Sequence, residues 1–323
     1  MRVLVTGGAG FIGSNVADRL LTDGHRVTVL DNFDPYYDPA QKRRNVARAL
    51  KHPSYRLVEA DVRDLPALER AFDAAEPEVV VHLAAKAGVR TSTLDPESYV
   101  AVNELGGLHV LSTCQKRGNV PVVYASTSSV YGSEAPTPFR EDDAATRPLS
   151  PYAASKRSGE LMAHAFHNIH RLPAAILRFF TVYGPRGRPD MAMWSFTKAL
   201  RAGDPIRLHG ERTERDFTFV SDIVDGVVGA MHWVLETRGF DTFNLGRSEP
   251  VRVRRLIELL ADQLGCAPKV VLGELAPGES PVTAADVGKA HATFGYAPRV
   301  SLSEGIRRWV EWVDQSEEAP RPS

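Results

Sequence analysis

Residues 3–13 read Val-Leu-Val-Thr-Gly-Gly-Ala-Gly-Phe-Ile-Gly, and this stretch decides the fold of the first part of the chain. The apolar run before the glycines predicts a buried parallel strand, and the glycines predict a sharp turn into a helix. Gly8, Gly10 and Gly13 satisfy G-x-G-x-x-G, and Gly7 with the last two satisfies the related G-x-x-G-x-x-G. A side chain at these positions would block the turn, the approach of backbone to phosphate, or the packing of helix on strand. The start of the helix is therefore expected to face a dinucleotide pyrophosphate.

The next strand candidate, residues 26–30, ends at Asp31. A carboxylate at this place is expected to accept hydrogen bonds from the ribose hydroxyls of the dinucleotide. The same charge would repel a 2′-phosphate, and no Arg follows immediately, so the sequence favours NAD over NADP. The alternative is a glycine-rich turn that binds no ligand, and the position of Asp31 argues against it.

Composition is typical of an enzyme in the cytoplasm. The chain has 323 residues, a formal net charge of −1 and 43% hydrophobic residues, enough for a large core in two lobes. A charge near zero with no long basic run disfavours nucleic acid as a partner. Cys114 and Cys266 are too few for a disulfide framework and lack metal-ligand spacing, so no metal site is predicted. The first strand is predicted to begin at residue 2, so no signal peptide is expected, and no apolar run is long enough to predict a membrane span.

Strands and helices alternate over the first 180 or so residues, which predicts an α/β fold of the Rossmann type with a doubly wound parallel sheet. The expected strands, besides the two above, are residues 56–58, 78–83, 120–125 and 174–178, and the expected helices are 11–21, 65–74, 96–117 and 152–169. The pattern becomes less regular after Gly184. We therefore predict an NAD-binding domain over 1–184, a smaller mixed lobe for substrate over 185–316, and a flexible tail over 317–323. A later segment, about 217–246, is expected to return to the first domain.

Tyr152 and Lys156 are four residues apart and share one face of the last of these helices. A free phenol is a poor base at neutral pH, because its pKa is about 10. A lysine ammonium together with a positively charged nicotinamide ring is expected to stabilise the phenolate and lower that pKa. Thr127, at the end of the preceding strand, is placed to share a substrate proton with Tyr152. A Tyr-x-x-x-Lys pair alone is usually a surface feature; its position after the glycine turn favours a catalytic role.

With these motifs the chain resembles the extended short-chain dehydrogenases/reductases of the nucleotide-sugar epimerase/dehydratase group. The likeness covers nearly the whole length, and within the group it is most similar to UDP-glucuronate 4-epimerases. The residues that carry this likeness are 30–38, 87–90, 125–132 and, most specifically, 179–192, which read Phe-Phe-Thr-Val-Tyr-Gly-Pro-Arg-Gly-Arg-Pro-Asp-Met-Ala. A further matching stretch is residues 212–222.

The resemblance implies that Thr127, Tyr152 and Lys156 are the catalytic residues. It implies 4-epimerisation through a transient 4-keto sugar, with an NAD that is regenerated in each turnover and stays bound. The cofactor contacts that it implies, besides Tyr152 and Lys156, are Gly7, Gly10, Phe11, Ile12, Asp31, Asn32, Asp61, Val62, Leu83, Ala84 and Ala85. The UDP-sugar contacts that it implies, besides Thr127 and Tyr152, are Val89, Arg90, Ser128, Ser129, Thr181, Arg188, Arg207, His209, Arg215 and Glu279. Arg188 and Arg215 suit a diphosphate electrostatically, and His209 is a candidate for stacking on uracil.

The residues after Thr127 separate the reactions of the group. Related dehydratases carry Asp-Glu there and related decarboxylases Ser-Glu, whereas this chain has Ser128-Ser129, whose hydroxyls are not strong bases. Epimerisation is therefore favoured, and these hydroxyls with that of Thr181 are expected to hold a sugar carboxylate. Two residues depart from the common pattern of the group: Lys86 replaces a frequent Gln, and Glu279 replaces a frequent Asp.

Two alternatives stay open at this point. One is a 4-epimerase for UDP-glucose or UDP-N-acetylglucosamine, which a substrate assay distinguishes. The other is an NAD-binding regulatory protein without activity, which retention of both Tyr152 and Lys156 disfavours. The stretches 100–114 and 162–169 are apolar on more than one side of a helix, and relatives pair two such helices in a four-helix bundle. A homodimer is therefore expected.

Overall fold

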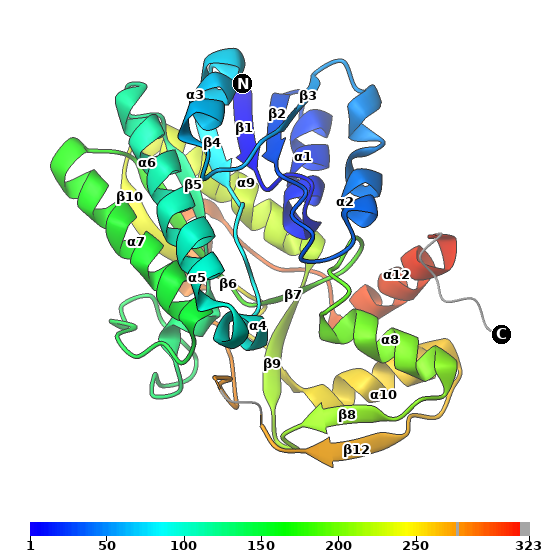
Figure 1. Cartoon of the computed structure of the whole chain (residues 1–323). Helices are drawn as coiled ribbons and strands as arrows, with labels where there is room; N and C mark the ends of the chain where they lie inside the picture. The colour runs from blue at the N-terminus through cyan, green and yellow to red at the C-terminus, as the bar shows by residue number, and fades with distance from the viewer. Residues whose placement is uncertain (276–277, 317–323) are drawn as a thin grey trace.

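A seven-stranded parallel sheet forms the centre of the computed structural model, which describes residues 1–275 and 278–316 (Figure 1). The strand order is β10-β6-β5-β4-β1-β2-β3, and every neighbouring pair in it is parallel. The strands are β1 (Arg2–Thr6), β2 (Arg26–Asp31), β3 (Tyr55–Glu59), β4 (Val79–His82), β5 (Val122–Thr127), β6 (Ala174–Phe179) and β10 (Phe240–Leu245). The order reverses at β1, which is the mark of a doubly wound sheet. The predicted Rossmann-type fold is confirmed.

Helices cover both faces of this sheet, as Figure 1 shows. They are α1 (Phe11–Thr22), α2 (Pro39–Val46), α3 (Leu65–Ala75), α6 (Gly107–Lys116), α7 (Pro151–His170) and α9 (Val220–Thr237). Val3 and Val5 of β1 pack in one core with α1 and α9, whereas Leu4 packs in the other with α3 and α6. Successive side chains of a strand point to opposite faces, so a strand between two helical layers must be apolar throughout. This explains the unbroken apolar runs of the sequence.

The helix predicted over residues 96–117 is present but not uniform. It consists of α5 (Pro96–Tyr99), a π-helical segment η2 (Val100–Gly106) and α6. Asn103 in η2 receives a hydrogen bond from the N–H of Lys86 (2.8 Å) and donates to the Lys86 carbonyl (3.0 Å). π-helical turns often occur at functional sites. Here the turn fixes the chain that follows β4.

The rest of the chain forms two small sheets with their own helices. One sheet has the order β11-β9-β7 and the other pairs β12 with β8. These elements are β7 (Thr181–Tyr183), β8 (Ile206–His209), β9 (Glu214–Phe219), β11 (Pro250–Arg252) and β12 (Val270–Gly273), with α8 (Ala192–Ala202), α10 (Val253–Leu264), α11 (Gly288–Phe294) and α12 (Leu302–Gln315). Short helices complete the chain: η1 (Ala49–Lys51), α4 (Val89–Leu94) and η3 (Ser128–Tyr131).

Residues 240–245 lie in the main sheet beside β6, whereas β9 pairs in the small sheet. The division into two domains stays a prediction, and the tail predicted over 317–323 lies outside the described residues. Within residues 1–275 and 278–316, no helix combines the length and apolar character that crossing a membrane requires.

Candidate active site

The glycine turn between β1 and α1 is built so that only glycine fits. Gly7 has φ +70°, and a Cβ there would lie 2.6 Å from the backbone nitrogen of Ala84. A Cβ on Gly13 would lie 2.2 Å from the carbonyl oxygen of Gly7. Gly10 caps α1 without a side-chain hydrogen bond, so the start of the helix keeps backbone N–H groups for a ligand. The turn therefore fits a pyrophosphate.

Asp31 ends β2 beside this turn. One carboxylate oxygen accepts from the N–H of Ala9 (3.0 Å) and the other from the N–H of Phe33 (2.8 Å). Next to it, Asn32 donates to Asp61 (2.8 Å), whose carboxylate also forms a bidentate pair with Arg63. The Arg63 pair holds the pKa of Asp61 down at about 2. Two acceptor groups thus lie where the sequence places a ribose.

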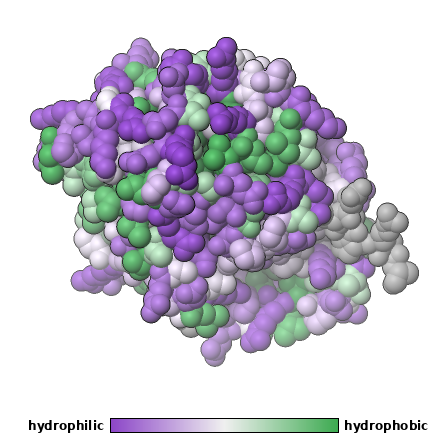
Figure 2. All heavy atoms as spheres, turned by 45° about the horizontal axis from the view of Figure 1, so that its top comes forward, coloured by the Kyte–Doolittle hydropathy of each residue, from purple (hydrophilic) through white to green (hydrophobic). Residues whose placement is uncertain are grey.

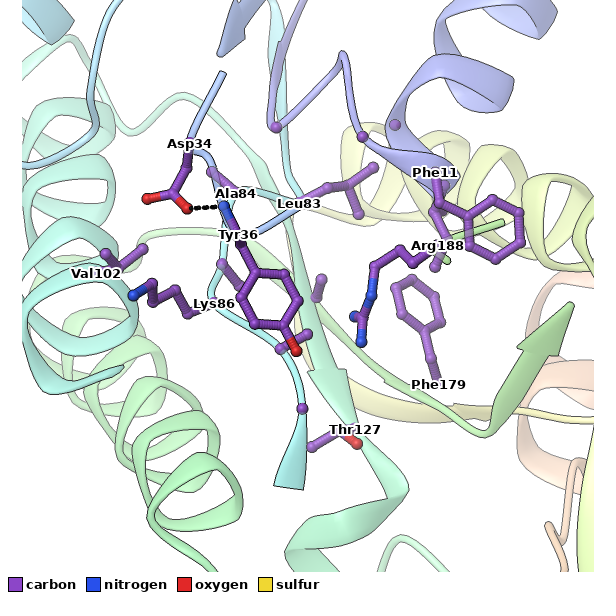
Figure 3. A pocket seen from close by; sticks show the side chains of 18 of the residues that line it. Phe11, Asp34, Tyr36, Leu83, Ala84, Lys86, Val102, Thr127, Phe179 and Arg188 are labelled. Atoms are coloured by element: carbon purple, nitrogen blue, oxygen red, sulfur yellow. Dashed lines mark hydrogen bonds between the residues drawn. The ribbon is translucent and has the colours of Figure 1, made fainter. Parts of the chain in front are cut away.

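A cavity of about 390 Å³ runs from the glycine turn along the carboxyl ends of the strands. Figure 3 shows a view into it, with Phe11, Leu83 and Ala84 near one end and Thr127 at the other. The residues predicted for the cofactor all line this cavity: Gly7, Gly10, Phe11, Ile12, Asp31, Asn32, Asp61, Val62, Leu83, Ala84, Ala85, Tyr152 and Lys156. Ligands bind at this edge of open α/β sheets. The donor set, the glycines and the space therefore fit a dinucleotide.

The first turn of α7 brings Tyr152 to the same cavity. Ser150 caps the helix by accepting from the N–H of Ala153 (3.2 Å), and Pro151 occupies the first helical position. Lys156 follows one turn later, with its Nζ 5.4 Å from the ring centroid of Tyr124. Thr127 comes from the end of β5, as predicted, and lines the cavity with both residues.

The pKa of the Tyr152 phenol differs from the sequence-based expectation that Lys156 lowers it. Burial raises the pKa of Tyr152, and it is the Thr127 hydroxyl and the Arg188 charge that oppose the rise. Burial also lowers the pKa of Lys156 to about 8, against the opposing charge of Glu160. Desolvation of the phenol is the largest influence on the pKa of Tyr152, and the charge that acts against it is that of Arg188 rather than that of Lys156. Arg188, which is distant from Tyr152 in sequence, supplies the positive charge that favours the phenolate form of Tyr152.

A second cavity, about 690 Å³, opens beside the first and shares part of its lining. It contains the remaining residues predicted for the UDP-sugar: Val89, Arg90, Ser128, Ser129, Thr181, Arg188, Arg207, His209, Arg215 and Glu279. Glu279 accepts from both Arg90 and Arg215 at 3.0 Å. Burial lowers the pKa of Arg215, while the Glu279 charge acts against this. Four arginines, Arg90, Arg188, Arg207 and Arg215, thus line a cavity that shares residues with the one that contains Tyr152.

Known proteins with this sequence pattern identify the family. A family model described as the NAD dependent epimerase/dehydratase family matches residues 3–246. The chain belongs to this family. A probable UDP-glucuronate 4-epimerase of Rhizobium meliloti is 40% identical, with 98% of each chain covered.

Two solved structures of the epimerase/dehydratase family show the same fold. The UDP-glucuronic acid 4-epimerase of Bacillus cereus, in complex with UDP-glucuronic acid and NAD, has a TM-score of 0.90 at 34% sequence identity. The match covers 98% of this chain and 99% of that protein's chain. The UDP-glucose 4-epimerase of Thermus thermophilus, in complex with NAD, has a TM-score of 0.85 at 34% sequence identity, and the match covers 97% of this chain and 98% of that protein's chain. The predicted family and the predicted cofactor, NAD, are confirmed.

The epimerase/dehydratase site also contains residues that sequence reasoning missed. Tyr36 lines both cavities, and Asp190 lines the second. Lys42 lines the first, with its Nζ donating to the carbonyl of Asp34 (3.0 Å). Lys86, noted as a departure from the common pattern, also lines the first cavity, where its Nζ donates to Ser98 (2.9 Å). No spacing rule joins these positions, because they come from helix α2 and from separate loops.

The position of Asp31 leads to a prediction about the cofactor. Replacing Asp31 with Ala removes a ribose acceptor and a charge that repels a 2′-phosphate, so NAD binding should weaken more than NADP binding. Binding of both dinucleotides to the ligand-depleted protein is measured by calorimetry. The expected change in the NAD/NADP ratio is about tenfold or more, since a hydrogen bond to a charged group contributes about 1.5–3 kcal/mol. Equal affinities of the unaltered protein for both dinucleotides would contradict this role of Asp31.

Proposed function

We propose that the chain is an NAD-dependent 4-epimerase of UDP-sugars that interconverts UDP-glucuronate and UDP-galacturonate. The observation that carries the proposal is that Tyr152 and Thr127 line the first cavity together with Ser128, Ser129, Thr181 and Arg188, which also line the second. One cavity fits a dinucleotide, and the other is lined with arginines and hydroxyl groups. A sugar beside these shared residues has its reacting carbon between the cofactor and a proton acceptor.

The residues around Tyr152 then have separable roles. When bound, NAD supplies the hydride acceptor and, in its reduced form, the donor. Tyr152 takes the proton of the sugar 4-hydroxyl and returns it, and Thr127 shares that proton through its own hydroxyl. Burial keeps the phenol protonated at rest, while the charge of Arg188 stabilises the phenolate as it forms. Lys156, buried one turn along α7, adds a second positive charge.

An acidic sugar is favoured by the hydroxyl groups that follow β5. Thr127 Oγ1 donates to Ser129 Oγ and accepts from the Ser129 N–H, both at 3.2 Å, which holds the two hydroxyls together. Ser128, Ser129, Thr181 and Arg188 line both cavities. They offer donors to a carboxylate and no strong base at the carbons beside the 4-keto group. This arrangement supports epimerisation over loss of water or CO2.

Proton NMR during incubation with UDP-glucuronate tests the proposal. We expect the H4 and anomeric signals of UDP-galacturonate to appear without added NAD, because the cofactor stays bound. UDP-glucose under the same conditions is expected to react more slowly. Faster turnover of UDP-glucose would favour the neutral-sugar alternative that the Thermus thermophilus relative represents. No turnover of any UDP-hexose would favour a regulatory protein.

Substitution of Ser129 tests how the carboxylate is held. Ser129→Glu places a like charge beside it, so binding of UDP-glucuronate should weaken by about tenfold or more, while UDP-glucose should lose less. Ser303→Glu, on the exposed side of α12, adds the same charge far from the cavities and is the control. Dissociation constants are measured by calorimetry. Equal weakening for both UDP-sugars would mean that Ser129 does not contact the carboxylate.

We also propose a homodimer that joins the α5–η2–α6 stretch and α7 of two copies. Hydrophobic side chains remain exposed there: Val100, Leu105, Leu161, Met162 and Ile169. α6 and α7 lie side by side in Figure 1, and Figure 2 shows hydrophobic groups among hydrophilic ones on this side of the molecule. Light scattering at micromolar concentration checks the proposal; a mass of 35.4 kDa, that of one chain, would exclude it. Cytoplasmic location stays a sequence-based prediction.

A further inference from the structure

Tyr36 lines both cavities, although no step of the proposed reaction uses it. It comes from residues 30–38, which carry part of the family resemblance. In Figure 3 its ring points into the cavity between Lys86 and Arg188. Its hydroxyl donates to Asp190 (3.1 Å) and lies 3.2 Å from the hydroxyl of Thr91. Burial raises the pKa of Tyr36, so the phenol keeps the proton that it donates.

Asp190 in turn fixes one edge of the Arg188 guanidinium. Arg188 Nε donates to one carboxylate oxygen of Asp190 (2.9 Å) and Nη2 to the other (2.7 Å). This two-point contact sets the plane of the guanidinium and leaves the Nη1 side for a ligand. Burial alone would lower the pKa of Arg188, but the bonds to Asp190 raise it, so the side chain stays charged. Asp190 therefore orients Arg188 and leaves the Nη1 hydrogen-bond donors of its guanidinium for a ligand.

Further hydrogen bonds connect the backbone of Tyr36 to the cofactor site. Asn32, which bonds to Asp61, accepts from the N–H of Asp34 (3.0 Å). Asp34 accepts from the N–H of Tyr36 (2.9 Å), a bond drawn in Figure 3. These side-chain bonds to the backbone two residues further on make successive tight turns. They fix the start of the Tyr36 side chain relative to the predicted ribose acceptors.

The space around the Tyr36 hydroxyl is closed by α4 and the chain before it. A Cβ on Gly88 would lie 2.7 Å from the Tyr36 oxygen, so the phenol packs directly on the backbone there. Thr91 Oγ1, which contacts this oxygen, also lies 2.5 Å from the hydroxyl of Tyr99. The Tyr36 hydroxyl thus has a defined position, with partners on α4 and in the loop of Asp190, and its α4 partner is in turn held by Tyr99 of α5.

We propose that Tyr36, acting through Asp190, is a positioning residue that orients Arg188 for the acidic part of the UDP-sugar and links it to the dinucleotide site. The proposal rests on the proposed function, because it takes the second cavity as the UDP-sugar site. Tyr36 contributes one hydrogen bond to a charged group, so its loss should weaken ligand binding by about tenfold. The proton transfer at Tyr152 does not depend on it.

Tyr36→Phe removes only the phenol oxygen and keeps the ring. On the NAD-bound protein we expect KM for UDP-glucuronate to rise about tenfold while kcat changes by less than about threefold. The matched control is Tyr55→Phe on β3, since the buried Tyr55 oxygen has no hydrogen-bond partner among the described residues and Tyr55 lines neither cavity. An unchanged KM in Tyr36→Phe, or an equal rise in the control, would overturn the proposal.

Asp190→Asn distinguishes positioning from direct contact with substrate. If Tyr36 acts through Asp190, the double variant Tyr36→Phe/Asp190→Asn should be no weaker in binding than Asp190→Asn alone. Multiplied effects would mean that Tyr36 contacts the ligand independently, and the proposed route would be wrong. Calorimetry with UDP-glucuronate on NAD-bound variants that also carry Tyr152→Phe gives the same comparison without turnover. A protein that binds UDP-glucuronate with this pattern but does not convert it when Tyr152 is intact would refute the proposed reaction and leave the role of Tyr36 intact.

Discussion

Replacing Tyr152 with Phe is expected to reduce 4-epimerisation by at least about 10²–10⁴-fold, the usual contribution of a positioned acid–base group. The substitution removes one oxygen, and with it the acceptor for the 4-hydroxyl proton. Thr127 cannot replace it, because a neutral hydroxyl is a much weaker base than a phenolate. The remaining rate is measured by NMR over extended incubation with UDP-glucuronate.

The fold and the cofactor should survive this substitution. The Tyr152 ring, which phenylalanine retains, packs edge-on against the ring of Tyr99 at 6.1 Å between centroids. The glycine turn and Asp31, which are expected to hold NAD, lie on other elements. NAD content after purification and the thermal unfolding temperature should therefore match those of the unaltered protein. Full activity in Tyr152→Phe would exclude Tyr152 as the proton acceptor.

Local patterns in the sequence were sufficient to predict the main sheet and the residues at the centre of the site. The glycine turn, Asp31 at the end of β2 and the Tyr152–Lys156 spacing all depend on residues that are close in sequence. Their positions in space follow from one rule, that parallel strands of a doubly wound sheet place their carboxyl ends at one edge. The predicted cofactor residues meet in one cavity for this reason.

Other parts of the structure have no local signal. α2 buries polar side chains, so it shows no apolar period: Gln41 donates to the carbonyl of Gly187 (3.1 Å) and Asn45 to that of Ala9 (3.0 Å). The contact of Tyr36 with Asp190 joins residues 154 positions apart. Spacing cannot predict such pairs, and neither can it predict that desolvation raises the pKa of Tyr152 against the charge of Arg188.

A buried ion pair behind the catalytic strand carries the second large expected effect. Glu160 on α7 and Arg178 on β6 are 3% and 2% exposed, and Arg178 Nε and Nη2 donate to the two carboxylate oxygens at 3.0 and 2.8 Å. Ser126, next to Thr127, also donates to Glu160, and so does Arg157. The Arg178 guanidinium carbon lies 4.6 Å from the ring centroid of Tyr131. The pair therefore ties α7 to the two strands beside the site.

Glu160→Ala should lower the free energy of unfolding by about 3–5 kcal/mol, because it leaves the Arg178 charge buried without a counter-ion. Glu258→Ala, which breaks the exposed pair with Arg255 on α10, is the control and should cost about 0–1 kcal/mol. Urea unfolding followed by circular dichroism measures both. Replacing the whole pair, as Glu160→Leu with Arg178→Met, should restore part of the loss, since no unpaired charge remains.

The same pair sets a direction for the effect of pH. Burial would raise the pKa of Glu160, but the bonds and charge of Arg178 outweigh it and lower the pKa in the folded protein. A carboxylate whose pKa is lowered on folding stabilises the protein above its unfolded pKa of about 4.3, and this contribution is lost as pH falls through the folded value. The difference in unfolding free energy between the unaltered protein and Glu160→Gln should therefore be largest near neutral pH and shrink in acid. A difference that stays constant from neutral pH down to about pH 3 would mean that the charge of Glu160 does not stabilise the fold.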